Sequence, residues 1–501
     1  MTFEIVFVLL SLLGMVAALV ADKMRPGMIL FSVVVLFLCA GILTPKEMLE
    51  GFSNKGMITV ALLFLVSEGI RQSGTLGQVI KKLLPQGKTT VFKAQLRILP
   101  SVAFISAFLN NTPVVVIFAP IIKHWAKSVN LPATKFLIPL SYVTILGGTC
   151  TLIGTSTNLV VHGMILEAGF EGFSMFELGK VGIFIAIAGI IYIFLFSKRL
   201  LPDARPDTAV PDEEVEEGEK LHRVEAVLGA RFPGINKKLK DFNFQRHYGA
   251  EVKEIKTRNG QRFVTNLDDV VLHEGDTLVV MADDTFIPTW GESSVFVLLT
   301  NGNEPDTTGK KKRWFALLLL VLMIVGATVG ELPVTKEMFP DIKLDMFFFV
   351  SITTIIMAWT NLFPARKYTK YISWDILITI ACAFAISKAM VNSGVADSVA
   401  KFIIGLSDDY GPHVLLAMVF IITNLFTELI TNNAAAALAF PLALSISAQL
   451  GVSPTPFFVV ICMAASASFS TPIGYQTNLI VQGIGNYKFM DFVRIGLPLN
   501  L

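Results

Sequence analysis

Two stretches of this chain are built from the same motifs in the same order. Each motif recurs 320 or 321 residues further along the chain. The matching pairs are 65–76 with 385–396, SAFLNNTPVVVIFAP at 106–120 with TELITNNAAAALAFP at 427–441, and TLIGTSTNLVVHG at 151–163 with TPIGYQTNLIVQG at 471–483. Because order and spacing are both kept, the chain contains two copies of one unit, at about 56–163 and 374–484.

Both copies lie in sequence that is apolar enough for a membrane. Only 16% of the residues are charged, and almost half of these fall between 198 and 313. Stretches near the roughly 20 residues that cross a bilayer occur at 3–21, 27–43, 56–71, 135–165, 178–197, 314–330, 345–363, 374–391 and 456–484, and polar motifs interrupt two more at 94–122 and 412–450. These patterns predict an all-α polytopic membrane protein, with membrane halves at 1–200 and 314–501 around one charged insert. A net charge of +2 argues against a nucleic-acid partner.

The basic residues predict how the two copies are oriented. Lys23 and Arg25 follow the first span, which places the N-terminus outside the cell. Counting onward, the segment 94–122 begins and ends on the basic side, so it is predicted to be a re-entrant hairpin, and 198–313 is cytoplasmic. The first copy then enters the membrane from outside and the second from inside. Such an inverted repeat is typical of secondary transporters, and it predicts a transporter of the cell membrane rather than an enzyme.

Four polar motifs interrupt the apolar spans. In the first hairpin Asn110, Asn111 and Thr112 precede Pro113, and in the second Thr431–Asn433 precede an alanine run. Asn and Thr are good helix caps and Pro favours the first turn, so a helix is expected to begin at each tip. A helix N-terminus attracts anions, while unwound carbonyls and Asn or Thr oxygens suit Na⁺. The remaining motifs, in 147–158 and 466–478, predict breaks within single crossings. Helix packing alone explains Gly and Ser there, but it does not explain paired asparagines at matching points.

These motifs resemble those of a known family. LNNTP and TELITNNAA are similar to the two hairpin signatures of the divalent anion:sodium symporters of the ion transporter superfamily, and LIGTSTNLV and PIGYQTNLI are similar to its two unwound-helix signatures. The resemblance implies a homodimeric elevator-type symporter that moves sulfate or a dicarboxylate with Na⁺ and needs no organic cofactor. Carried over position by position, the Na⁺ ligands would come from Asn110, Asn111, Gly154, Thr427, Thr431, Asn432 and Gly474. The substrate ligands would be Asn111, Thr112, Thr155, Asn432, Asn433, Tyr475 and Gln476.

The sequence departs from the family pattern at the substrate positions. Asn stands for Ser at 110 and for Thr at 433, and Tyr475 and Gln476 stand where carboxylate transporters often have Thr-Pro. These departures favour sulfate or a similar oxyanion over a C4-dicarboxylate such as succinate, which remains the runner-up. A cation/proton antiporter would need intramembrane carboxylates at the broken helices. A nutrient sensor that does not transport would have no need of two cation sites.

Three ionisable residues lie in the apolar sequence, where such residues are often functional. Glu68 and Lys388 occupy matching places in the two copies, which suggests a buried pair near the substrate path. Glu428 precedes the second hairpin tip and is a candidate proton or cation relay. The alternatives are that these side chains reach an interface with water or only stabilise the helix bundle.

The charged insert divides into three parts. Residues 201–220 form an acidic linker and 303–313 a basic one, and between them 221–302 alternates like half-buried strands, with a hairpin turn at RNGQ and a short helix within 232–244. This α+β pattern resembles a TrkA-C (RCK-C) domain, a regulatory module of several transport systems. The resemblance implies a small-molecule ligand of unknown identity, or else a structural or dimerising role.

Overall fold

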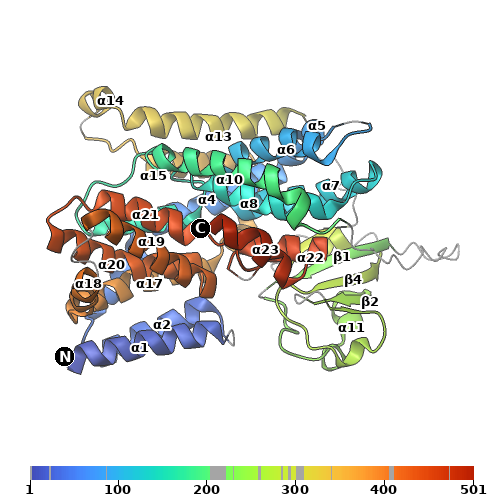
Figure 1. Cartoon of the computed structure of the whole chain (residues 1–501). Helices are drawn as coiled ribbons and strands as arrows, with labels where there is room; N and C mark the ends of the chain where they lie inside the picture. The colour runs from blue at the N-terminus through green and yellow to red at the C-terminus, as the bar shows by residue number, and fades with distance from the viewer. Residues whose placement is uncertain are drawn as a thin grey trace, which may run out of the picture.

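A computed structural model describes the chain at 3–21, 24–85, 87–203, 222–229, 231–257, 261–283, 286–290, 295–300, 310–339, 341–405, 411–472 and 474–500. Within these residues the protein is mostly helical, and one small sheet lies beside the helices (Figure 1). Seven helical stretches are long and apolar enough to cross a bilayer: Phe3–Val20, Pro45–Gln72, Gly179–Leu200, Lys310–Gly330, Trp374–Asn392, Gly411–Leu429 and Asn432–Leu450. The chain therefore has the build of a polytopic membrane protein.

The two copies contain the same succession of helices. The first consists of α4 (Lys55–Gln72), α5 (Thr75–Leu83), α6 (Val91–Ser106), α7 (Asn111–Ser128), α8 (Leu137–Gly148) and α9 (Ser156–Glu167). The second consists of α17 (Trp374–Asn392), α18 (Val395–Gly405), α19 (Gly411–Leu429), α20 (Asn432–Leu450), α21 (Thr455–Ser466) and α22 (Gln476–Gly485). The other helices are α1 (Phe3–Val20), α2 (Pro26–Cys39), α3 (Pro45–Glu50), α10 (Gly179–Leu200), α13 (Lys310–Gly330), α14 (Pro333–Met338), α15 (Met346–Trp359), α16 (Tyr368–Tyr371) and α23 (Phe489–Asn500).

The helices are interrupted where the polar motifs predict. α7 begins at Asn111 and α20 at Asn432, in the middle of the two tip motifs. The Thr431 hydroxyl caps α20 by accepting a hydrogen bond from the Ala434 amide. The chain is also non-helical at 149–155 and 467–472, within the two predicted breaks. Each arm of the second hairpin, α19 and α20, has 19 residues. That length alone would span a bilayer, so the re-entrant course remains a prediction.

The two copies pack against each other at their centres. α7 of the first copy lies against α22 of the second, and α20 of the second lies against α9 of the first. One hydrophobic core joins both copies and includes Val114, Tyr142, Val161, Phe458 and Val481. The four helices that follow the polar motifs are thereby held together.

The insert contains a five-stranded sheet in the order β3-β2-β4-β1-β5 with antiparallel neighbours. Its elements are β1 (His222–Leu228), α11 (Phe244–Tyr248), β2 (Glu251–Lys256), β3 (Arg262–Phe263), β4 (Thr277–Ala282), α12 (Phe286–Trp290) and β5 (Phe296–Thr300). The prediction of a helix within 232–244 is wrong, because that segment has only the short 3₁₀ turn Leu239–Asp241 and α11 starts at its last residue. Pro233 and Gly234 oppose a helix there. Most of both predicted linkers and most of the RNGQ turn lie outside the described residues.

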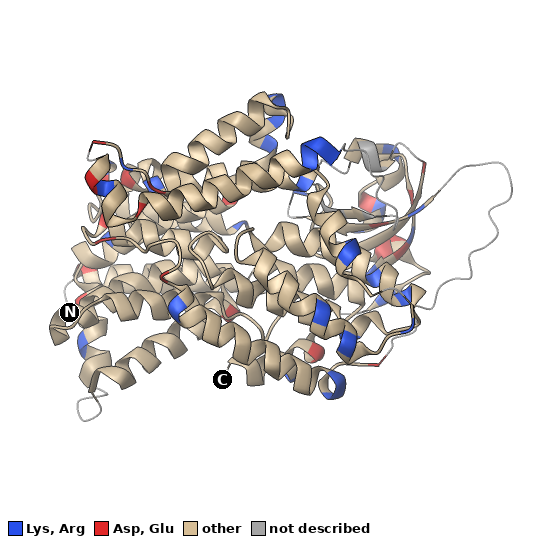
Figure 2. Ribbon diagram, turned by 90° about the horizontal axis from the view of Figure 1, so that it is seen from above, with Lys and Arg blue, Asp and Glu red and all other residues tan. Residues whose placement is uncertain are grey.

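The insert adjoins the basic end of the helix bundle. Figure 2 shows Lys and Arg concentrated on the side where the sheet lies. In Figure 1 the strands β1 and β4 lie next to α22. The insert and these basic residues therefore lie on the same side of the helix bundle.

Candidate transport site

Asn111, at the first hairpin tip, is fully buried and joins the two copies. Its amide orientation is assigned from its partners. Oδ1 accepts a hydrogen bond from the Tyr475 hydroxyl at 2.6 Å, and Nδ2 donates to Ser106 Oγ at 2.8 Å. Nδ2 also reaches the carbonyl oxygens of Thr144 at 3.0 Å and Gly154 at 3.3 Å. The tip of the first hairpin is thus tied both to its own broken helix and to that of the second copy.

The second tip repeats part of this arrangement. Asn432 Oδ1 lies 2.8 Å from the Thr427 hydroxyl, just as Asn111 lies 2.8 Å from Ser106. Ser106 and Thr427 are equivalent positions in the repeat, each five residues before its asparagine. Thr427 is fully buried, and its hydroxyl also lies 2.7 Å from the carbonyl oxygen of Ala465 in the second broken helix. Both copies therefore attach the tip asparagine to a hydroxyl on the preceding helix.

Contacts between the copies lie at the starts of α9 and α22. Thr112 Oγ1 at the first tip lies 3.4 Å from Gln476 Oε1, at the start of α22. At the second tip, Asn433 Oδ1 accepts hydrogen bonds from Thr157 Oγ1 at 3.3 Å and Ser156 Oγ at 3.4 Å, at the start of α9. The N-termini of four helices meet here, and each supplies partial positive charge.

Tyr475 lies between the hairpin tip and both broken helices. It is 9% exposed, and its hydroxyl lies 2.6 Å from the Asn111 amide and 3.1 Å from Thr155 Oγ1. The structure thus brings together three of the predicted substrate residues, Asn111, Thr155 and Tyr475. Asn433 contacts the start of α9 through Ser156 and Thr157. Asn110 lies beside this group and lines a largely apolar pocket with Ser67, Ser156 and Phe108.

Two asparagines that sequence reasoning did not single out hold the broken helices in shape. Asn158 Nδ2 donates to the carbonyl oxygens of Gly148 at 3.3 Å and Thr151 at 2.8 Å. Asn478 Nδ2 donates to the carbonyls that precede it by the same intervals, at 2.8 and 3.1 Å. Both asparagines are fully buried. Their place in both copies of the repeated TNL motif could have identified them.

The second broken helix encloses a group of buried oxygens. A Cβ atom at Gly474 would collide with Ser468 Oγ and would lie 3.1 Å from Thr471 Oγ1 and 3.2 Å from the Thr427 carbonyl oxygen. Ser468 Oγ is buried without a hydrogen-bond partner among the described residues, as is Ser466 Oγ.

The first broken helix has the matching arrangement. There a Cβ atom at Gly154 would collide with the Gly148 carbonyl oxygen, and one at Gly148 would lie 3.1 Å from the Gly154 carbonyl oxygen. Gly148 and Gly154 are the repeat equivalents of Ser468 and Gly474. Carbonyl, hydroxyl and amide oxygens are the ligands of a hard cation such as Na⁺, so the oxygen-rich surroundings of Gly154 and Gly474 fit this ion.

Glu428 is tied to the second broken helix. Its carboxylate accepts hydrogen bonds from the Ser470 amide at 2.9 Å, Thr471 Oγ1 at 2.8 Å and Asn500 Nδ2 at 2.7 Å. The equivalent position in the first copy is Ala107, so the first copy has no carboxylate at this point of the repeat. The carboxylate orders the backbone around the second oxygen group and links it to α23.

The suggested pair of Glu68 and Lys388 does not form. Glu68 binds Arg71 through two hydrogen bonds at 2.7 and 2.8 Å, and it accepts a third from Gln72 at 2.6 Å. Lys388 is exposed. Arg71 lies one helical turn beyond Glu68, which makes the local pair easier to form than one between the copies.

Known proteins match this chain over nearly all its length. Residues 16–451 and 342–501 match the citrate transporter family. An uncharacterized transporter of Synechocystis is 30% identical over 94% of this chain and 90% of its own length. The chain belongs to the citrate transporter family. It is thus an integral multi-pass membrane protein of a transporter family, as the resemblance to the sodium symporters of the same superfamily predicts.

Two further relatives of this chain come from Chlamydomonas reinhardtii. A putative sulfur deprivation response regulator is 28% identical over 94% of this chain and 95% of its own length. A probable sodium/sulfate cotransporter is 23% identical over 96% of this chain and 85% of its own length. Both matches extend across the membrane halves and the insert.

Proposed function

We propose that this protein is a secondary transporter that couples the entry of Na⁺ to the uptake of a small divalent anion, with sulfate as the preferred substrate. The observation that carries the proposal is the pair of matching oxygen groups at Gly154 and Gly474. An enzyme or a simple receptor has no need for two equivalent cation sites at the centre of an inverted repeat.

The chemistry of the tips supports a coupled mechanism. Among the described residues, the side-chain hydrogen bonds of Asn111, Thr112, Asn432 and Asn433 involve only neutral partners, namely side-chain amides, hydroxyls and backbone carbonyls. These neutral donors and the helix N-termini can orient an anion but supply no full positive charge. Two Na⁺ ions bound beside them would offset a charge of −2. Anion binding is then weak without Na⁺, which is the basis of coupling.

Sulfate is preferred to a carboxylate for two reasons. The Tyr475 hydroxyl bridges Asn111 and Thr155, and this bulk disfavours an extended anion between them. A probable sodium/sulfate cotransporter also aligns with almost the whole chain. The runner-up is a C4-dicarboxylate; the family's description as citrate transporters supports a carboxylate substrate in general.

A sensor that does not transport is the second candidate, and the similarity to a putative sulfur deprivation response regulator favours it. The retention of both oxygen groups supports transport instead. We further place the N-terminus outside and the insert in the cytoplasm, and we assign the protein to homodimers that work by an elevator motion, as in the symporters that it resembles.

The deciding experiment is uptake of radiolabelled sulfate into proteoliposomes, with and without an inward Na⁺ gradient and with succinate as competitor. Na⁺-driven uptake that succinate does not inhibit is expected. Inhibition by succinate would indicate that the symporter's preferred substrate is a carboxylate rather than sulfate. If neither sulfate nor succinate enters the proteoliposomes under a Na⁺ gradient, the proposed symport is refuted. The variant Asn111→Ala should abolish uptake, whereas Asn392→Ala, which removes an exposed amide on α17, should not.

A further inference from the structure

The sheet insert rests on two helices that begin at the candidate transport site. α7 starts at Asn111 and α22 at Gln476. Further along these helices, Lys123 of α7 binds Glu225 of β1, and Gly483 of α22 lies against Thr277 of β4. Since a helix rises about 1.5 Å per residue, Gly483 and Lys123 lie roughly 10 and 18 Å from the first residues of their helices.

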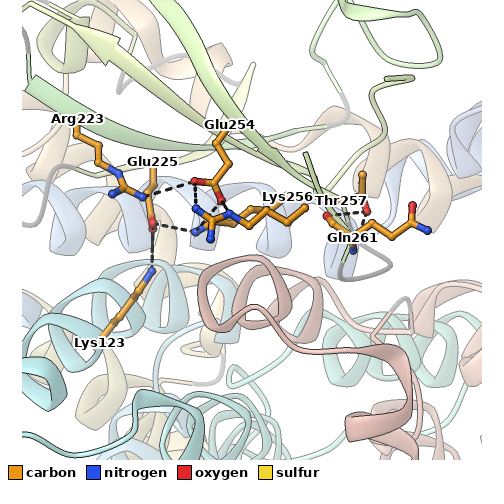
Figure 3. Close-up of polar contacts among 8 residues, drawn as sticks. Lys123, Arg223, Glu225, Glu254, Lys256, Thr257 and Gln261 are labelled. Carbon is orange, nitrogen blue, oxygen red and sulfur yellow. Dashed lines mark hydrogen bonds and ion pairs between the residues drawn. The ribbon is translucent and has the colours of Figure 1, made fainter. Parts of the chain in front are cut away.

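The contact with α7 is part of a chain of alternating charges (Figure 3). Lys123 Nζ lies 3.1 Å from both carboxylate oxygens of Glu225, and Lys256 Nζ reaches Glu225 at 3.4 Å. Beyond Lys256, Glu254 accepts a hydrogen bond from Arg262 at 2.8 Å.

These charges are poorly solvated. Glu225 is 18% exposed and Lys123 21%, while Lys256 is only 5% exposed. If a partly buried carboxylate loses one of its two cationic partners, the folded state is destabilised, because the negative charge stays desolvated and is less well compensated. The Lys123–Glu225 pair therefore favours the docked position of the insert.

The contact with α22 is a close approach to the helix surface. A Cβ atom at Gly483 would lie 2.6 Å from Thr277 Oγ1, and one at Gly275 would lie 2.6 Å from Leu479 Cγ. Thr277 is fully buried. Because neither glycine has a Cβ atom, the start of β4 packs directly against α22.

We propose that the insert is fixed to α7 and α22 and moves with them during the transport cycle, with Lys123–Glu225 as the positioning contact. A ligand bound by the insert would then act directly on the two helices whose first residues form the site. An insert held only by its terminal linkers could not act in this way. The inference rests on the proposed symport, since it assumes that α7 and α22 belong to the part that carries the substrate.

A disulfide between the insert and α22 tests the inference directly. Cysteines form a bond when their Cβ atoms are about 3.5 to 4.5 Å apart, and a Cβ at residue 483 would lie 4.0 Å from the Thr277 Cβ. The full-length chain therefore receives Thr277→Cys and Gly483→Cys together. The native cysteines are free thiols and stay in place, and each single variant serves as a control for their oxidation.

The expected result is rapid cross-linking, with the same Na⁺-driven sulfate uptake in oxidised and reduced proteoliposomes. Uptake that falls by about tenfold or more on oxidation and returns with dithiothreitol would mean that the insert must leave α22 in each cycle. That result overturns the proposal. Failure of the pair to cross-link at all in the membrane would also overturn it, because the two surfaces would then not be in contact.

The positioning role of the ion pair has its own test. Lys123→Glu should slow the formation of the 277–483 disulfide, whereas Lys123→Arg, which keeps the positive charge, should leave its rate unchanged. Equal rates in all three proteins would exclude the ion pair as the docking contact. Cross-linking is read without transport, so an absence of uptake by the wild-type protein refutes the symport alone, whereas a block caused only by the disulfide refutes the fixed insert alone.

Discussion

The variants Asn158→Ala and Asn478→Ala test whether the broken helices are preformed cation sites. Each side-chain nitrogen donates two hydrogen bonds to carbonyls of its own broken helix. Asn478 also accepts a hydrogen bond from Ser141 Oγ at 2.7 Å, whereas the Asn158 oxygen is buried without a partner among the described residues. Removing Asn478 therefore costs one more hydrogen bond than removing Asn158.

The magnitude follows from these counts. One hydrogen bond contributes about 1 kcal/mol net, which gives about 2 kcal/mol for Asn158→Ala and about 3 kcal/mol for Asn478→Ala. If bound Na⁺ must reorder the loosened segment, this free energy is subtracted from Na⁺ binding. Since about 1.4 kcal/mol corresponds to a factor of ten, the half-saturating Na⁺ concentration should rise roughly 30-fold and 100-fold.

The assay is the initial rate of sulfate uptake as a function of Na⁺ concentration in proteoliposomes. Asn392→Ala is the matched control, because its side chain also donates two hydrogen bonds, at 3.2 and 3.1 Å, but it is exposed and distant in sequence from both breaks. It should leave the Na⁺ dependence unchanged. If both site variants also kept the wild-type Na⁺ dependence while remaining folded, the two asparagines would not order the cation sites.

Three further outcomes are expected. Tyr475→Phe leaves the buried Asn111 oxygen without its donor, so sulfate affinity should fall by roughly tenfold, and unchanged sulfate competition curves would contradict a substrate role. Glu428→Gln replaces charge-assisted hydrogen bonds to the second broken helix, so Na⁺ affinity should fall more than with Asn424→Ala, a neighbour whose side-chain amide donates to the Ala467 carbonyl. Equal Na⁺ titrations would argue against this assignment. Burial of Glu225 raises its pKa, but Lys123 and Lys256 outweigh this and bring the pKa from 4.5 to about 2. The ionised carboxylate therefore stabilises the folded state above pH 4.5, and this stabilisation should be lost as pH falls toward 2; melting curves of Glu225→Gln should have a weaker pH dependence in that window, and parallel curves would refute this.

The repeat and its helix breaks could be predicted because they depend on local sequence. Asn and Thr before Pro113 or an alanine run determine where a helix starts, and glycines determine where one is interrupted, so α7, α20 and both breaks lie where the motifs predict. Charge pairing could not be predicted in the same way. Glu68 and Lys388 occupy equivalent positions of the repeat. Glu68 nevertheless pairs with Arg71, which lies one helical turn further along the same helix.

The position of the insert was beyond sequence reasoning for a different reason. Lys123 reads as one of several basic residues at a membrane boundary, and Glu225 as a charged residue on a strand. Only the fold brings their side chains together, 102 residues apart in sequence. Gly483 reads as the glycine that ends a motif, and the first copy has an equivalent glycine at 163, which packs against Asn54 instead. Equivalent glycines thus have different roles: Gly163 contacts the start of another helix, whereas Gly483 contacts the insert. Symmetry in sequence therefore predicts the paired helix breaks well, but it cannot predict that the single insert contacts one helix of each copy, α7 and α22.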